Sequence, residues 1–160
     1  MSDSDDGPDH THIVADAGVL AADLLVGQAA REALDHVRRH SWLELVVTDP
    51  LLDDAEAVIA DLADGELAAD WRVKIEAEAT VVDQSEGDTP ALAAAYEGDA
   101  AHIVTLNGRL QSAAAGANLK KHMDVSVRSP DAFARMFDPE GVYEFVFEDS
   151  YPGPDSDPRA

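Results

Sequence analysis

Short apolar runs alternate with longer helical stretches along most of this 160-residue chain. The apolar runs read HIVAD at 12–16, LELVV at 43–47, HIVTL at 102–106 and MDVSV at 123–127. Brief runs of this kind, bounded by turn residues, are typical of buried strands. Strands that alternate with helices form parallel βαβ units. The sequence therefore predicts an α/β fold, a three-layer α/β/α sandwich around a central parallel sheet.

Helix signals fill the segments between these strands. Thr48-Asp49-Pro50, for example, is a helix start with proline in the first turn, and apolar residues follow it at helical spacing. The predicted helices cover residues 19–25, 28–40, 50–62, 66–79, 89–97, 110–115 and 130–137. The run VYEFVF at 142–147 is interpreted as an additional edge strand.

The two ends of the chain differ in composition from the rest. Residues 1–11 and 149–160 are rich in Asp, Ser, Pro and Gly and poor in side chains that a core can bury. We expect both segments to be disordered, the first as an acidic N-terminus and the second as a C-terminal tail. Residues 12–148 then form a single domain, and a chain of this length buries a sizeable core.

Carboxylates dominate the charge of the chain. Asp and Glu number 33 against 11 Lys and Arg, and the formal net charge is -22. Such a surface repels its neighbours and stays dissolved, and at molar salt a Debye length of about 3 Å screens the self-repulsion. We interpret the composition as halophilic adaptation. A face that mimics nucleic acid or binds cations is the alternative, but the acids are spread over the whole chain, which favours adaptation.

Several classes of protein do not fit the sequence. The chain has no cysteine, so it has neither a disulfide framework nor a thiolate site. No stretch approaches about 18 uninterrupted apolar residues, so no membrane span is expected. The N-terminus shows no signal-peptide pattern, and Gly18 and Gly27 are too far apart to form a glycine-rich phosphate loop. We therefore expect a cytoplasmic protein.

Acidic and amide side chains follow the predicted strands, where parallel strands end together. They are Asp16, Asp53, Asp54, Asp88 and Asn107. Ligands of open α/β sheets bind at this edge, and oxygen ligands without Cys or paired His favour a hard cation such as Mg²⁺ or Mn²⁺. Helix capping and solvation account for many acids in such a chain. Asp16 is the exception, because an acid at the end of a buried strand is harder to explain as solvated surface.

The order of these elements resembles the PIN domain, an α/β/α metal-dependent ribonuclease fold found in many toxin–antitoxin nucleases and RNA-processing proteins. The resemblance covers residues 12–137 and rests on IVADAGVL, VVTDPLLDDAEAVI and GDTPALAAAYEGDAAHIVTLNGRL. In these stretches the acids of the family fall on Asp16, Asp54 and Asp88. The resemblance thus implies a halophilic archaeal PIN protein in which these three residues are catalytic and, with Asn107, hold Mg²⁺ or Mn²⁺.

The sequence departs from the family's pattern in two places. Asn107 and Arg109 stand where the family commonly carries acids, and Ala17-Gly18 replaces a polar residue after the first acid. An amide oxygen coordinates a hard cation without contributing charge, so the affinity for metal falls. Arg109 either weakens the site further or holds a substrate phosphate.

Two functions therefore remain open. The resemblance implies an endoribonuclease in which a metal-activated water attacks an RNA phosphodiester bond. The alternative is a catalytically degenerate PIN-like module that binds RNA or a protein partner such as an antitoxin. A homodimer is expected, because dimers are common among proteins that this chain resembles.

Basic residues are few, and their positions suggest two surfaces. A candidate RNA-binding patch near the carboxyl edge consists of Arg109, Lys120, Lys121 and Arg128, with His122 beside them. The alternative is that these residues form a solvated basic turn without a binding role. A second group lies on the helix predicted at 28–40. It either balances the negative charge of nearby acids or forms a surface for a dimer or another partner. It consists of Arg31, Arg38 and Arg39.

Overall fold

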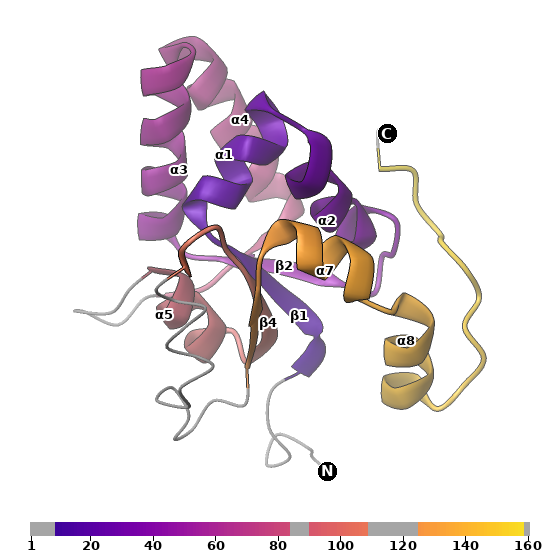
Figure 1. Cartoon of the computed structure of the whole chain (residues 1–160). Helices are drawn as coiled ribbons and strands as arrows, with labels where there is room; N and C mark the ends of the chain where they lie inside the picture. Colours follow the sequence, from indigo (N-terminus) through magenta and orange to yellow (C-terminus); the bar gives the residue numbers. More distant parts are fainter. Residues whose placement is uncertain (1–8, 84–89, 109–124, 159–160) are drawn as a thin grey trace.

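The computed structural model describes residues 9–83, 90–108 and 125–158. Five parallel strands form one sheet with helices on both faces (Figure 1), so the predicted α/β fold is confirmed. The helix predicted at 110–115 lies outside the described residues. No helix within them is long and apolar enough to cross a membrane.

The first strand in the sequence lies at the centre of the sheet. β1 (Asp9–Ala15) pairs with β2 (Glu44–Val47) on one side and with β4 (Ala100–Val104) on the other. β3 (Thr80–Val81) and β5 (Ser126–Arg128) complete the order β3-β2-β1-β4-β5. Along the chain, β1, β2 and β3 come first on one side of the sheet, and β4 and β5 follow on the other side of β1. The topological switch point, where ligands of such sheets bind, therefore lies between β1 and β4.

The helices cover both faces of the sheet, with α1, α2, α4 and α7 over one face and α5 under the other (Figure 1), while α3 packs against α1 and α4. Their bounds are α1 (Ala17–Leu25), α2 (Gln28–Arg38), α3 (Asp49–Leu62), α4 (Gly65–Glu78), α5 (Pro90–Glu97), α7 (Pro130–Met136) and α8 (Pro139–Phe147). These bounds agree with the helices predicted up to residue 97 and at 130–137.

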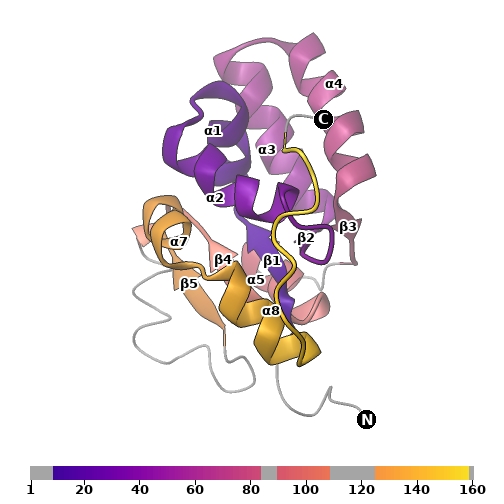
Figure 2. The same ribbon diagram turned by 90° about the vertical axis from the view of Figure 1, so that its right-hand side faces the viewer.

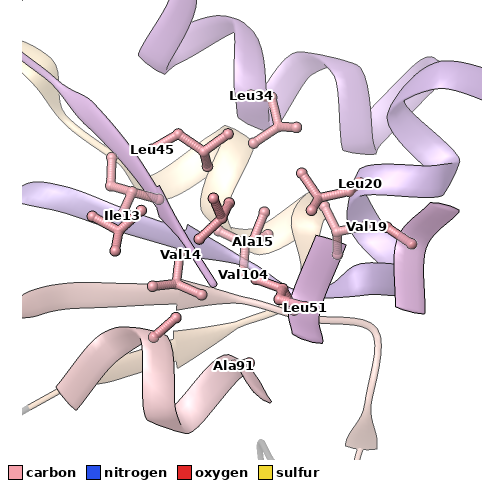
Figure 3. Close-up of a cluster of buried hydrophobic side chains, with 14 of the residues drawn as sticks. Ile13, Val14, Ala15, Val19, Leu20, Leu34, Leu45, Leu51, Ala91 and Val104 are labelled. Atoms are coloured by element: carbon pink, nitrogen blue, oxygen red, sulfur yellow. The ribbon is translucent and has the colours of Figure 1, made fainter. Parts of the chain in front are cut away.

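The central strand is buried on both faces. Figure 3 shows Val14 pointing toward Ala91 of α5, whereas Leu45 of β2 lies toward Leu34 of α2 on the other side of the sheet. Parallel strands buried on both faces have near-continuous apolar runs, which is why β1 and β2 are recognisable in the sequence.

A close approach between α5 and the sheet requires glycine at position 98. A Cβ there would overlap Val46 Cγ1 and lie 2.9 Å from the carbonyl oxygen of Ala94. The next residue, Asp99, has a positive φ of 56° and turns the chain into β4. The tight turn after α5 thus brings β4 alongside β1.

The run at 142–147 forms part of helix α8, so its prediction as an edge strand is wrong. Pro139 occupies the first turn of the helix. Tyr143 and Phe147 lie one turn apart on the same helix face, and their ring centroids are 5.1 and 5.8 Å from that of Trp42. The alternation of aromatic and other residues resembles a strand pattern, but the four-residue spacing that packs on Trp42 determines the structure.

The predicted domain boundaries also differ from the structure. Residues 9–11 belong to β1 rather than to a disordered N-terminus. Residues 149–158, expected to be disordered, run from α8 back past α2 and β2 (Figure 2). There the main-chain N–H groups of Asp155 and Ser156 donate to the carbonyl oxygen of Arg39 at 2.8 and 3.1 Å. Specific hydrogen bonds, which composition does not reveal, fix this segment.

Candidate functional site

Asp16 lies at the switch point, where it ends β1 and caps α1. Its Oδ1 accepts a hydrogen bond from the N–H of Ala17 at 2.8 Å. Its own N–H donates to the carbonyl oxygen of Val104 at 2.9 Å, which ties the residue to the end of β4. The side chain is half-buried. The carboxylate is therefore held between the ends of the two strands that flank the switch point.

Thr105 holds Asp16 from the β4 side. The residue is fully buried, and its Oγ1 donates to Oδ2 of Asp16 at 2.8 Å and accepts from the N–H of Asn107 at 3.0 Å. Its main-chain N–H donates to the carbonyl oxygen of Arg128 at 2.9 Å. One residue thus connects the ends of β1, β4 and β5. Thr105 is not among the site residues predicted from the sequence, although a polar residue near the end of the apolar run HIVTL is the same signal that indicates Asp16 in HIVAD.

Asn107 and Arg128 lie at the same edge of the sheet. Asn107 is exposed two residues after Thr105, with its backbone fixed by the Thr105 hydroxyl. Arg128 is half-buried at the end of β5, in register with Val104. The structure therefore brings together Asp16, Asn107 and Arg128 among the residues predicted from the sequence.

Asp54 lies on α3, the helix that begins after β2 at this edge. Thr48 caps that helix, and its side chain accepts from the N–H of Leu51 at 3.2 Å. Asp54 is exposed in the second turn, whereas the neighbouring Asp53 is bound by Arg72 of α4 at 2.9 Å. The two adjacent acids thus differ in their surroundings, because Asp53 belongs to an ion-pair network between α3 and α4.

The other predicted site residues lie outside the described residues. They are Asp88, Arg109, Lys120 and Lys121. Within the described part of the chain, no three His, Asp or Glu side chains are grouped so that they could hold a metal ion.

The chemistry of Asp16 suits a hard cation. Each carboxylate oxygen accepts one hydrogen bond, and a carboxylate has about four lone-pair sites, so capacity for a metal remains. The Thr105 hydroxyl and the Ala17 N–H fix the orientation of the carboxylate, as outer partners of metal ligands commonly do. Asn107 adds an exposed amide at the same edge. The donors are all of the oxygen type that Mg²⁺ and Mn²⁺ prefer.

The fold and this edge define an α/β domain with a polar site at the switch point of a parallel sheet. The chain belongs to DUF7384, a family of unknown function, and the match covers residues 7–159. The matched region includes the C-terminal segment that passes α2. No curated protein and no solved structure matches the chain.

Proposed function

We propose that this chain is a Mg²⁺- or Mn²⁺-dependent endoribonuclease of PIN type that hydrolyses RNA phosphodiester bonds at the carboxyl edge of the sheet. The observation that carries the proposal is the carboxylate of Asp16, held at the switch point by Thr105 and by the first N–H of α1. A carboxylate needed only for solvation would not require a fully buried hydroxyl to orient it. A cytoplasmic location is part of the same proposal.

The metal in this proposal is held by Asp16, Asp54 and Asp88, with the amide oxygen of Asn107 as an additional ligand. A metal ion held by these residues would supply a water molecule of lowered pKa for the attack on the phosphate, and positive charge to stabilise the charge that develops there. Asp16 is fixed in position by its two hydrogen bonds, whereas Asp54 is exposed in the second turn of α3.

The RNA backbone in this proposal is held by directional donors rather than by the overall charge, which is -22. Salt weakens non-specific attraction to phosphate, so contacts from guanidinium groups and helix N-termini must supply the binding. Arg128 and the N-termini of α1 and α3 lie at this edge. The proposed RNA-binding patch also includes Arg109, Lys120 and Lys121, which lie outside the described residues.

The experiment is cleavage of a labelled single-stranded RNA in molar KCl with Mg²⁺ or Mn²⁺. We expect cleavage by the wild type and its loss in Asp16→Asn, Asp54→Asn and Asp88→Asn. Asp53→Asn is the matched control, because Asp53 is the sequence neighbour of Asp54 but binds Arg72. Cleavage that survives Asp16→Asn, or that Asp53→Asn and Asp54→Asn reduce equally, contradicts the assigned site.

Asn107 favours a second candidate, a PIN-like module that binds RNA or a protein partner such as an antitoxin without catalysis. Its exposed amide takes the place of a charged ligand. A wild type that binds the labelled RNA without cutting it, and that gains Mn²⁺-dependent cleavage on Asn107→Asp, would establish this candidate. Sedimentation of the same preparation tests the expected homodimer.

A further inference from the structure

A cleft of about 580 Å³ lies between α2 and α4, near the start of β2. Parallel strands place the carboxyl edge at the opposite end of the sheet, so the cleft is separate from the proposed nuclease site. Its apolar lining includes Leu34, Leu45, Trp71 and Ile75. The volume is within the range of about 300–1,000 Å³ that is common for binding sites.

Basic side chains gather at this cleft in a strongly acidic protein. Three of the 11 Lys and Arg residues line it, namely Arg31, Arg38 and Lys74. Arg38 forms ion pairs with the buried carboxylates of Asp23 and Asp35, so it is committed inside the protein.

The other two cations form no ion pair with a carboxylate of the described residues. Arg31 donates to the main-chain oxygens of Asp23 and Leu24, which carry no net charge. Lys74 is exposed on α4, one turn before Glu78. An acidic segment bound in this cleft would lie near two cations, whereas most of the surface repels it.

The chain's own C-terminal segment, Tyr151–Pro158, passes α2 and β2 (Figure 2), and its last described residues line this cleft; we call the segment the strap. The Tyr151 hydroxyl lies 2.6 Å from Nε2 of His40. Nδ1 of that ring is 2.7 Å from the carbonyl oxygen of His36 and therefore donates, so Nε2 of the neutral ring accepts from Tyr151. Asp157 and Pro158 then line the cleft itself.

Asp155 fixes the middle of the strap. Its two carboxylate oxygens accept from the N–H and the hydroxyl of Ser41, each at 2.7 Å. These bonds lower the pKa of Asp155, because they favour its charged form. The strap is thus an extended acidic segment, rich in proline, that the protein binds through main-chain and carboxylate groups.

The strap lies on the surface of the protein and is not buried in its interior. Pro152, Pro154, Asp155, Ser156 and Asp157 are all exposed. Segments that bury little apolar surface open locally at low free-energy cost, without unfolding the domain. The strap can therefore leave the rim of the cleft while the sheet stays intact.

We infer that the cleft between α2 and α4 is a docking site for an extended acidic segment of a partner protein, and that the strap is its intramolecular competitor. The strap itself shows the chemistry that the site accepts, and tethering gives it a high effective concentration. A partner gains the site by displacing the strap.

The test uses the full chain and a fluorescent peptide with the sequence of residues 149–160. Fluorescence anisotropy in molar KCl compares the wild type with the double variant Tyr151→Phe/Asp155→Ala, which loosens the strap. We expect the variant to bind the peptide at least about tenfold more tightly, because the tethered competitor is weakened. No binding by the variant, or equal binding by both proteins, overturns the inference.

Control variants locate the binding. Lys74→Glu in the loosened background is expected to weaken peptide binding, while Arg135→Glu is expected to leave it unchanged, because Arg135 is exposed on α7 and pairs with Asp131. Equal effects of the two changes overturn the assigned cleft. If the loosened variant instead forms dimers that exclude the peptide, the occupant is a second copy of the chain and the inference of a partner segment is wrong.

Hydrogen exchange on the wild type gives a measurement that requires no variant. The amides of Asp155 and Ser156 donate to Arg39, and the amide of Ser41 donates to Asp155. A displaceable strap predicts that all three exchange much faster than the amides of β1. Exchange only through global unfolding shows that the strap cannot be displaced, and overturns the inference.

Discussion

The hydroxyl of Thr105 lies 2.8 Å from Oδ2 of Asp16, a residue 89 positions earlier in the chain. Thr105 is fully buried and also fixes the N–H of Asn107 and the end of β5. The orientation of Asp16 therefore depends on a group that contributes no charge and that metal-site reasoning does not select. Substitutions at Thr105, Arg72 and His102 test how much such uncharged, ion-paired and buried side chains contribute to the stability of the protein.

Thr105→Val keeps the shape of the side chain but removes the hydroxyl. The Asn107 N–H then loses its acceptor and the Asp16 carboxylate loses a donor, which costs about 1–3 kcal/mol of unfolding free energy. Chemical denaturation in molar KCl measures this loss. Under the proposed function, metal-dependent cleavage also falls strongly in Thr105→Val. Thr105→Ser retains the hydroxyl and is expected to keep most of the activity, so similar losses in both variants would contradict an orienting role.

Arg72→Met tests the network between α3 and α4. Burial opposes the charge on Arg72, but hydrogen bonds to Glu76 and Asp53 outweigh it and raise the pKa of Arg72. Arg72 also contacts Asp49 and Glu56. Without the guanidinium, four carboxylates repel one another, and we expect a loss of about 1–3 kcal/mol in dilute salt that shrinks at molar salt.

The matched control for this change is Arg135→Met. Arg135 forms one exposed ion pair with Asp131 within α7, and such pairs contribute about 0–1 kcal/mol. Thermal unfolding at two KCl concentrations compares the two variants. An equal and salt-independent effect of both changes would show that the α3–α4 network has no special importance.

His102 predicts a pH dependence of stability. Its ring packs among those of Phe133, Phe137 and His10, and neither ring nitrogen has a hydrogen-bond partner within the described residues. Burial, with smaller contributions from His10 and Arg128, lowers the pKa of His102 from 6.5 to about 4. Between these values the unfolded chain binds the proton and the folded chain does not. Stability therefore falls as the pH drops from 6.5 to about 4, by about 3 kcal/mol from this residue.

The measurement is the unfolding free energy of the wild type and of His102→Phe across that range of pH. Phenylalanine keeps an aromatic ring among its neighbours but does not titrate. We expect the variant to lose less stability on acidification than the wild type, and the difference to level off below about pH 4. Parallel pH profiles would contradict the assignment of this dependence to His102.

Local signals in the sequence were sufficient to predict the layers of the fold. The apolar runs of β1 and β2 and the proline at the start of α3 each determine an element through neighbouring residues alone. The helix α8 was mistaken for a strand, because its choice between two patterns depends on Trp42, about 100 residues away. The strap was expected to be disordered for a similar reason, since its order depends on His40 and Ser41. Composition carries no information about such distant partners.

The candidate site is also predictable only in part, because some of its features depend on local sequence and others on contacts between distant residues. Asp16 stands out because a buried strand ends in a charge, Asn107 follows β4, and Arg128 is the last residue of β5 at the same edge. The sequence did not reveal that Thr105 joins them, nor that Asp53 and Asp54 differ in their partners. Position along a strand is encoded locally, whereas hydrogen-bond partners across the sheet are not.

The strand order also has a consequence for how the protein is made. β1 leaves the ribosome early, yet one of its two neighbours is β4, which is synthesised much later. A nascent chain that ends before residue 105 already contains Asp16 but lacks the hydroxyl that orients it. The contact spans 89 residues, and contacts of such long range form slowly because a large loop must close first. The arrangement at the switch point is therefore incomplete on the ribosome until the second half of the sheet has been translated.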